Sequence, residues 1–204
     1  MAVPSKEFVQ QVLAKHDRDL ICRRAVEAGW KAVKEKHPDL AWWRRKATRA
    51  GVMWENTIDS AISLFAGVPG VKHIGHLDTA SFVIDDVLLA RFKVAGISLL
   101  TSNYPTPLAL AYDRHQRDLF GFRGLQRIEI VHVLNRFGTG LEWVGIVARQ
   151  NRRVTWDYEL RAAGELPVPL PLPQPQPKPA AATVLRPLKP KADEEKKKED
   201  KESE

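Results

Sequence analysis

The spacing of apolar positions changes where the chain passes residue 66. Before that point apolar side chains recur at every third or fourth position, which is the spacing of one face of an α-helix. Pro38 stops one of these helices, and Asp39 is placed to cap the next one. The pattern predicts helices over residues 5–16, 18–36 and 40–50, and the third of these can run on towards Phe65.

Beyond the loop at residues 66–70 the pattern becomes that of strands. Residues 80–95 are predicted to form two strands or one long bent strand, and Thr106-Pro107 opens a helix that reaches about Phe120. Strict alternation from Val154 to Leu160 is typical of a strand with one solvated face. Three further strands are predicted over residues 127–135, 141–149 and 153–160. We therefore expect an α+β fold, with an N-terminal helical layer packed on a mostly antiparallel sheet.

The distribution of proline marks the end of the folded region. Every second residue from Pro167 to Pro179 is proline, which removes backbone donors and fixes φ. A run rich in Lys and Glu follows, and Tyr158 is the last aromatic residue of the chain. Such a segment buries too little surface to offset the entropy of ordering it. We predict one domain over residues 1–164 and a disordered, Pro-rich and then charged tail over 165–204.

The net positive charge belongs to the predicted domain. The 204 residues carry a formal charge of +7, and residues 165–204 contain as many basic as acidic side chains. Residues 1–50 alone hold twelve Lys and Arg against six Asp and Glu. The positive excess is therefore concentrated in the predicted N-terminal helices.

Several classes of protein are disfavoured by the composition. A single cysteine, Cys22, excludes an intramolecular disulfide framework and a cysteine-based zinc module, and it fits a reducing compartment. No apolar run reaches the ~18 residues of a membrane span, and the N-terminus lacks a signal-peptide core. We expect a soluble, cytoplasmic protein that does not contact the membrane. No nucleophile elbow or phosphate loop occurs, so no catalytic residue and no cofactor is predicted.

Residues 39–54 (DLAWWRRKATRAGVMW) combine three tryptophans with four cations. On a continuous helix one face would pack against the core, and it holds Trp43, Ala47, Ala50 and Trp54. A separate face would hold Trp42, Arg45, Lys46 and Arg49. A tryptophan beside three cations can stack on a base and contact phosphates, which predicts a nucleic-acid surface. The alternatives are a solvated basic face or a membrane surface.

Two groups of residues are candidates for metal sites. His73, His76 and Asp78 lie close together in sequence, but no third His or Cys accompanies them, so ordinary loop polar groups are the preferred interpretation. The order of helix, strands, helix and strand over residues 54–135 resembles the core of restriction-endonuclease-like proteins. That resemblance implies a strand-end Asp, at Asp78 or Asp86, followed by an acid-x-Lys tripeptide that holds a catalytic metal. Arg91 stands where the second carboxylate is needed, so the site is either degenerate or accidental.

Four short motifs extend from the strand around residue 90 to the last predicted strand. They are LLARFK (88–93), SNYPTPLALAYD (102–113), FGTGLEWVGIVA (137–148) and VTWDYEL (154–160). This series resembles a poorly characterised family of small bacterial and phage-borne proteins. The resemblance implies an accessory protein from a cassette that also encodes a helix-turn-helix regulator and a zinc metallopeptidase, of the toxin–antitoxin or prophage-control type. It implies no activity and no catalytic residue.

Two residues of the first motif are also candidates for binding. Arg91 and Lys93 point to the same face of their strand, either as a pair that faces an anion or as a solvated edge. His132, in an otherwise apolar strand, is predicted to be a core histidine with satisfied hydrogen bonds.

Three functions follow from these patterns. The first is a non-enzymatic regulatory or interaction protein of a mobile-element or phage-defence cassette, which binds nucleic acid and a protein partner from the same locus. The second is a nuclease of the restriction-like class, active or degenerate. The third is a protein-binding scaffold tethered by the Pro-rich tail. The sequence predicts no oligomeric state.

Overall fold

A computed structural model describes residues 3–76, 79–101, 107–114 and 124–162. The chain divides into two units, residues 1–167 and 168–204, and every described residue belongs to the first. The tail predicted over residues 165–204 therefore lies outside the described residues.

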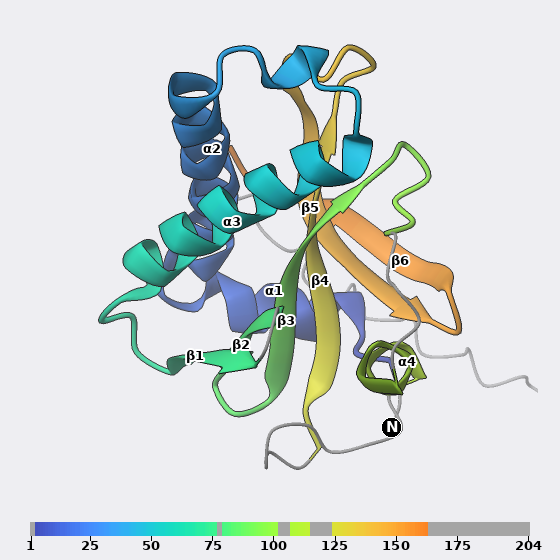
Figure 1. Ribbon diagram of the computed structural model, residues 1–204. Coiled ribbons are helices and arrows are strands. Elements are labelled where there is room, and N and C mark those ends of the chain that lie inside the picture. Colours follow the sequence, from blue (N-terminus) through green and yellow to red (C-terminus); the bar gives the residue numbers. More distant parts are fainter. Residues whose placement is uncertain (1–2, 77–78, 102–106, 115–123, 163–204) are drawn as a thin grey trace, which may run out of the picture. The chain divides into compact units, whose positions relative to one another are not determined.

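The N-terminal part is helical, as the sequence predicts (Figure 1). Ser5 caps the first helix by accepting a hydrogen bond from the backbone N–H of Phe8 at 3.2 Å. Gly29, in the second α-helix (α2), allows that helix to cross the third one (α3) closely, with the two backbones almost in contact at Thr57. The elements are α1 (Lys6–Ala14), the 3-10 turn η1 (Lys15–Asp17), α2 (Arg18–Lys36), the 3-10 turn η2 (Leu40–Trp42) and α3 (Lys46–Phe65).

A six-stranded sheet follows, with its strands in sequence order. Neighbouring strands are antiparallel except for β3 and β4, which are parallel and are linked through α4 (Pro107–Arg114). The strands are β1 (Val71–His76), β2 (Thr79–Ile84), β3 (Leu88–Ala95), β4 (Gln126–Leu134), β5 (Leu141–Gln150) and β6 (Arg153–Glu159). The protein thus has the expected α+β fold, with a helical region packed on a mostly antiparallel sheet.

The two faces of the sheet have different partners. Side chains such as Phe82, Phe92 and Ile130 form the main core with the N-terminal helices. Alternate residues of the same strands point to the other face, where Val83 and Leu89 pack with Tyr112 of α4. The phenol of Tyr112 lies within hydrogen-bonding distance of the carbonyl oxygens of Leu89 (3.1 Å) and Ile128 (2.6 Å), which fixes α4 over the sheet.

The prediction of one helix from residue 40 onwards is wrong at its start. A 3-10 turn ends at Trp42, and Trp43 is extended (φ −65°, ψ 130°) before α3 begins at Lys46. Asp39 does not cap a helix, because its carboxylate accepts a hydrogen bond from the indole Nε1 of Trp43 at 2.9 Å. The ring of His37 packs edge-on against the same indole. These contacts hold Trp43 out of the helical path.

The remaining elements agree closely with the sequence pattern. Residues 80–95 form two strands, β2 and β3, whose turn places Asp85 and Asp86 at positive φ. In β6 half-buried residues alternate with exposed ones, as expected of a strand with one solvated face. The helix predicted to reach Phe120 is described as α4 up to Arg114, and its further extent lies outside the described residues. No helix in the described ranges is long and apolar enough to cross a membrane.

Candidate functional site

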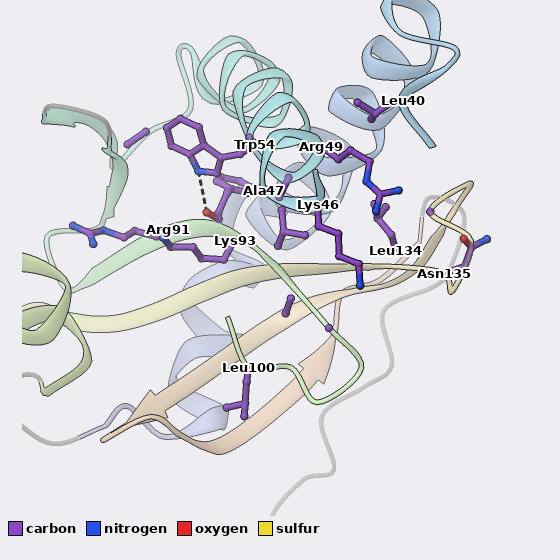
Figure 2. Close-up of a pocket in the computed structure, with 18 of the residues that line it drawn as sticks. Leu40, Lys46, Ala47, Arg49, Trp54, Arg91, Lys93, Leu100, Leu134 and Asn135 are labelled. Carbon is purple, nitrogen blue, oxygen red and sulfur yellow. Dashed lines mark hydrogen bonds between the residues drawn. The ribbon is translucent and has the colours of Figure 1, made fainter. Parts of the chain in front are cut away.

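A groove of about 700 Å³ lies between the first half of α3, the end of β3 and the β4–β5 hairpin (Figure 2). Its lining contains five cations, and none of the described residues that line it is Asp or Glu. Arg91 and Asn135 mark opposite ends of the groove in Figure 2. The five cations are Lys46, Arg49, Arg91, Lys93 and Arg136.

The groove lies where β3 continues beyond the residues that pair with β2. The β2–β3 register ends at Ala90, whereas β3 pairs with β4 as far as Ala95. The side of β3 that faces away from β4 is therefore open to α3 from Arg91 onwards. The indole Nε1 of Trp54 donates a hydrogen bond to the carbonyl oxygen of Phe92 at 3.2 Å, and this contact joins α3 to the strand (Figure 2).

Small residues of α3 make the space beside this contact. Ala47, Ala50 and Gly51 line the groove, and Ala47 and Gly51 are exposed. The sequence predicts that Ala47 and Ala50 pack in the core with Trp43 and Trp54. That prediction is wrong for Ala47, which is exposed. Because α3 begins at Lys46, Trp43 is not part of the helix and does not share a helix face with Ala47.

The four residues of the predicted Trp/Arg face do not share one helix. Trp42 belongs to η2 and is 87% exposed, and Arg45 is exposed just before α3 begins. Lys46 and Arg49 line the groove, and Figure 2 shows Lys46 extending from the start of α3 towards the sheet. Arg49 donates from Nη1 to the carbonyl oxygen of Ala41 at 2.9 Å, which ties the beginning of α3 to η2.

The β4–β5 hairpin supplies the facing wall. Gly138 adopts φ +66° in its turn, and a Cβ added there would lie 3.7 Å from Nη1 of Arg49. Phe137, between the lining residues Arg136 and Gly138, is 73% exposed. Arg136 and Phe137 were not predictable as site residues, because a turn sequence does not indicate which helix it approaches. Two exposed aromatic side chains, Trp42 and Phe137, therefore lie on the segments that border the groove.

Arg91 and Lys93 come from the same face of β3, as the alternation predicts, and both line the groove. The alternative of a solvated edge is wrong for Arg91, which is only 5% exposed. Its Nε donates to Oγ of Ser81 at 2.9 Å, and its Cζ lies 4.2 Å from the centre of the Tyr112 ring. Burial lowers the pKa of both Arg91 and Lys93, and a guanidinium nevertheless stays charged in proteins.

Below α4 the sheet carries further buried charges. Oε2 of Glu129 accepts hydrogen bonds from Nη1 of Arg149 and from Oγ1 of Thr101, both at 3.1 Å. Arg149 also lies 3.6 Å from the carboxylate of Asp113. This cluster is not among the residues predicted from the sequence. The sequence feature that could have indicated the cluster is a charged residue at alternate positions of an otherwise apolar strand, as at Glu129 in QRIEIVHVL.

His132 departs from the prediction of a satisfied core histidine. It is fully buried in β4, and neither ring nitrogen has a hydrogen-bond partner. Burial without a partner lowers its pKa to about 4, so the imidazole is neutral at pH 7. The side chain lies outside the groove lining.

The described residues of the two candidate metal motifs fall on β1, in the β2–β3 turn and on β3. His73 and His76 lie on the strand β1, so the interpretation of these two as loop residues is wrong, and Asp78 lies outside the described residues. Asp86 is in the β2–β3 turn, where its carboxylate is 2.9 Å from Nζ of Lys72. Within the ranges that the structure describes, no group of three or more His, Cys, Asp or Glu side chains could hold a metal ion.

Comparison with family models, curated proteins and solved structures finds no match to this chain. The resemblance to the phage-borne accessory family therefore stays a prediction, and the interpretation of the groove depends on its own geometry.

Proposed function

We propose that this protein is a non-enzymatic nucleic-acid-binding module, and that the groove between α3, β3 and the β4–β5 hairpin holds a single-stranded segment. The observation that carries this proposal is the groove lining, which has five cations and no acidic residue among the described positions. Cations in a groove attract the phosphate backbone and release its counterions. In the cassette context that the sequence resemblance implies, the module acts with a protein partner from the same locus.

The exposed aromatic side chains favour a single strand over a duplex. Trp42 and Phe137 are among the most exposed large hydrophobic residues of the described chain, at 87% and 73%. A base can stack on such a side chain only when it is not already stacked and paired in a duplex. Basic grooves with aromatic platforms are typical of proteins that bind single strands with little sequence preference.

The test is a titration of the full chain into labelled single-stranded DNA and RNA of about 12 nucleotides, followed by fluorescence anisotropy. We expect affinity to fall steeply between about 50 mM and 200 mM salt. The double variant Lys46→Glu with Arg136→Glu removes two exposed cations of the groove and adds two anions. It should weaken binding at low salt by roughly 2–4 kcal/mol.

The matched control is Arg24→Glu with Lys31→Glu. Both residues are exposed on α2 and neither lines the groove. The control changes the net charge of the protein by the same amount as Lys46→Glu with Arg136→Glu. We expect at most a small loss of affinity from this pair. If both double variants weaken binding equally, the attraction is to overall charge and the groove is not the site.

A second candidate function is a degenerate nuclease of the restriction-like class. The observation that favours it is the order α3, β1 to β3, α4, β4, with β3 and β4 parallel and Lys93 on β3. Arg91 occupies the position where that class needs a carboxylate, and a cation cannot hold Mg²⁺. We therefore expect no cleavage of labelled DNA or RNA with Mg²⁺. Cleavage that requires Mg²⁺ and disappears in Asp86→Ala would replace the first proposal with this one.

A further inference from the structure

The guanidinium of Arg91 is buried with an incomplete set of partners. Its Nε donates a hydrogen bond to Oγ of Ser81, whereas its Nη2 is inaccessible to solvent and has no hydrogen-bond partner. A buried donor without an acceptor is destabilising, and a buried charge without a counter-charge is more so. Arg91 is also one of the residues that line the groove, so this buried cation borders the space that a ligand would occupy.

Glu129 attracts Arg91, but this carboxylate is shared with other partners. Glu129 lies beside Arg91 in the β3–β4 register, but its Oε2 is hydrogen-bonded to Arg149 and Thr101. No carboxylate within the described ranges forms an ion pair with Arg91. Glu129 also attracts Lys93, so one carboxylate serves several cations, and an anion bound at this end of the groove would balance the remaining positive charge.

The position of the guanidinium is fixed before any ligand arrives. Ser81 holds Nε, and the ring of Tyr112 lies under Cζ at 4.2 Å. Tyr112 is in turn held by backbone carbonyl groups of β3 and β4. Lys93, two residues along the same face of β3, adds a second cation to the groove lining (Figure 2). An arginine that is held in place loses little freedom when it binds an oxyanion.

We propose that Arg91 and Lys93 form a phosphate-binding subsite at the inner end of the groove, where one phosphoryl group of a nucleic acid binds between the two cations. This inference rests on the proposed function for the identity of the ligand, but the subsite binds inorganic phosphate on its own. The phosphoryl group is either an internal phosphodiester or a terminal phosphate. The remaining groove cations contact other phosphates of the same strand.

The experiment is a calorimetric titration of the full-length protein with inorganic phosphate, at constant ionic strength with chloride as the reference anion. We expect saturable one-to-one binding that falls by about tenfold or more in Arg91→Met, because charge-assisted hydrogen bonds to phosphate are lost. Lys31→Met, which removes an exposed cation of α2 outside the groove, should change phosphate affinity less than about twofold. If circular dichroism shows that Arg91→Met does not fold, Lys93→Met takes its place. Absence of saturable binding to the wild type, or equal affinity in the subsite variants, would overturn the subsite.

Oligonucleotides separate the two sources of the phosphoryl group and the two proposals. Tighter binding of a 5′-phosphorylated strand than of its 5′-hydroxyl counterpart, with the difference lost in Arg91→Met, assigns the subsite to a terminal phosphate. Equal binding of both strands, weakened alike by Arg91→Met, assigns it to an internal phosphodiester. If the oligonucleotide binds in a salt-dependent way and Arg91→Met and Lys93→Met leave its affinity unchanged, the subsite is overturned and the proposed function stands. Phosphate binding without strand binding overturns the proposed function and leaves the subsite.

Discussion

The indole Nε1 of Trp54 and the carbonyl oxygen of Phe92 are 3.2 Å apart, and their hydrogen bond joins α3 to the open side of β3. The two residues are on walls of the groove that come from distant parts of the chain. Because the indole occupies this carbonyl, α3 keeps a defined distance from the strand, and the space beside Ala47, Ala50 and Gly51 stays open.

The first prediction concerns this contact. Trp54→Phe keeps an aromatic ring but removes the donor, so the free energy of unfolding should fall by about 1 kcal/mol, the usual net value of such a bond. Urea denaturation followed by circular dichroism measures the change. An unchanged midpoint would show that the contact does not hold α3 against β3.

The second prediction separates binding from stability at Trp42. Because the side chain is 87% exposed, Trp42→Ala should leave the free energy of unfolding within about 0.5 kcal/mol of the wild type. If a base stacks on the indole, the same variant weakens oligonucleotide binding by about 1–3 kcal/mol. A folded variant with unchanged affinity would remove Trp42 from the interface.

The third prediction tests the crossing of α2 and α3. A Cβ added to Gly29 would lie 2.6 Å from Cα of Thr57, which is backbone and cannot move alone. Gly29→Ala should therefore lower the free energy of unfolding by about 1–3 kcal/mol, although alanine is the better helix former. Gly51→Ala is the matched control, because nothing lies within 4 Å of its added Cβ. That variant should be more stable than the wild type by about 0.5–1 kcal/mol, so equal signs for the two would contradict the packing described.

The fourth prediction is a pH dependence caused by His132. Its folded pKa is about 4, below the ordinary value of 6.5, so the unfolded chain takes up a proton that the folded protein excludes. Stability should consequently fall as the pH is lowered from 6.5 to 4, by about 3 kcal/mol from this residue alone. His132→Met removes the titrating group and should flatten this part of the curve, measured by urea denaturation at several pH values. An unchanged slope would show that His132 is not excluded from protonation in the folded state.

The fold was largely predictable because its elements have strong local signals. The alternation in β6 and the pairing of Arg91 with Lys93 on one face depend only on the period of a strand, and both are found. The start of α3 was not predictable in this way. Asp39 is a good capping residue in sequence, but here a tertiary arrangement of Trp43 and His37 uses its carboxylate.

The groove was predictable only in part. Lys46, Arg49, Arg91 and Lys93 were candidates for two separate surfaces, and the structure places them in one lining. Their meeting depends on the β2–β3 register ending at Ala90, which no local pattern encodes. Arg136 joins them because the β4–β5 hairpin approaches Arg49, a contact between residues almost ninety positions apart.

The most direct test of the groove as the nucleic-acid site uses the tryptophans as reporters of position. Trp54 lines the groove and Trp42 is next to it, whereas the indole of Trp156 donates to the carbonyl oxygen of Pro4 and Trp30 is buried on α2. In ¹H–¹⁵N spectra with assigned indole signals, titration with a single-stranded oligonucleotide should shift the Nε1–H signals of Trp42 and Trp54 and leave those of Trp30 and Trp156 in place. Shifts confined to Trp30 and Trp156, or no shift of any indole at saturating oligonucleotide, would contradict the account.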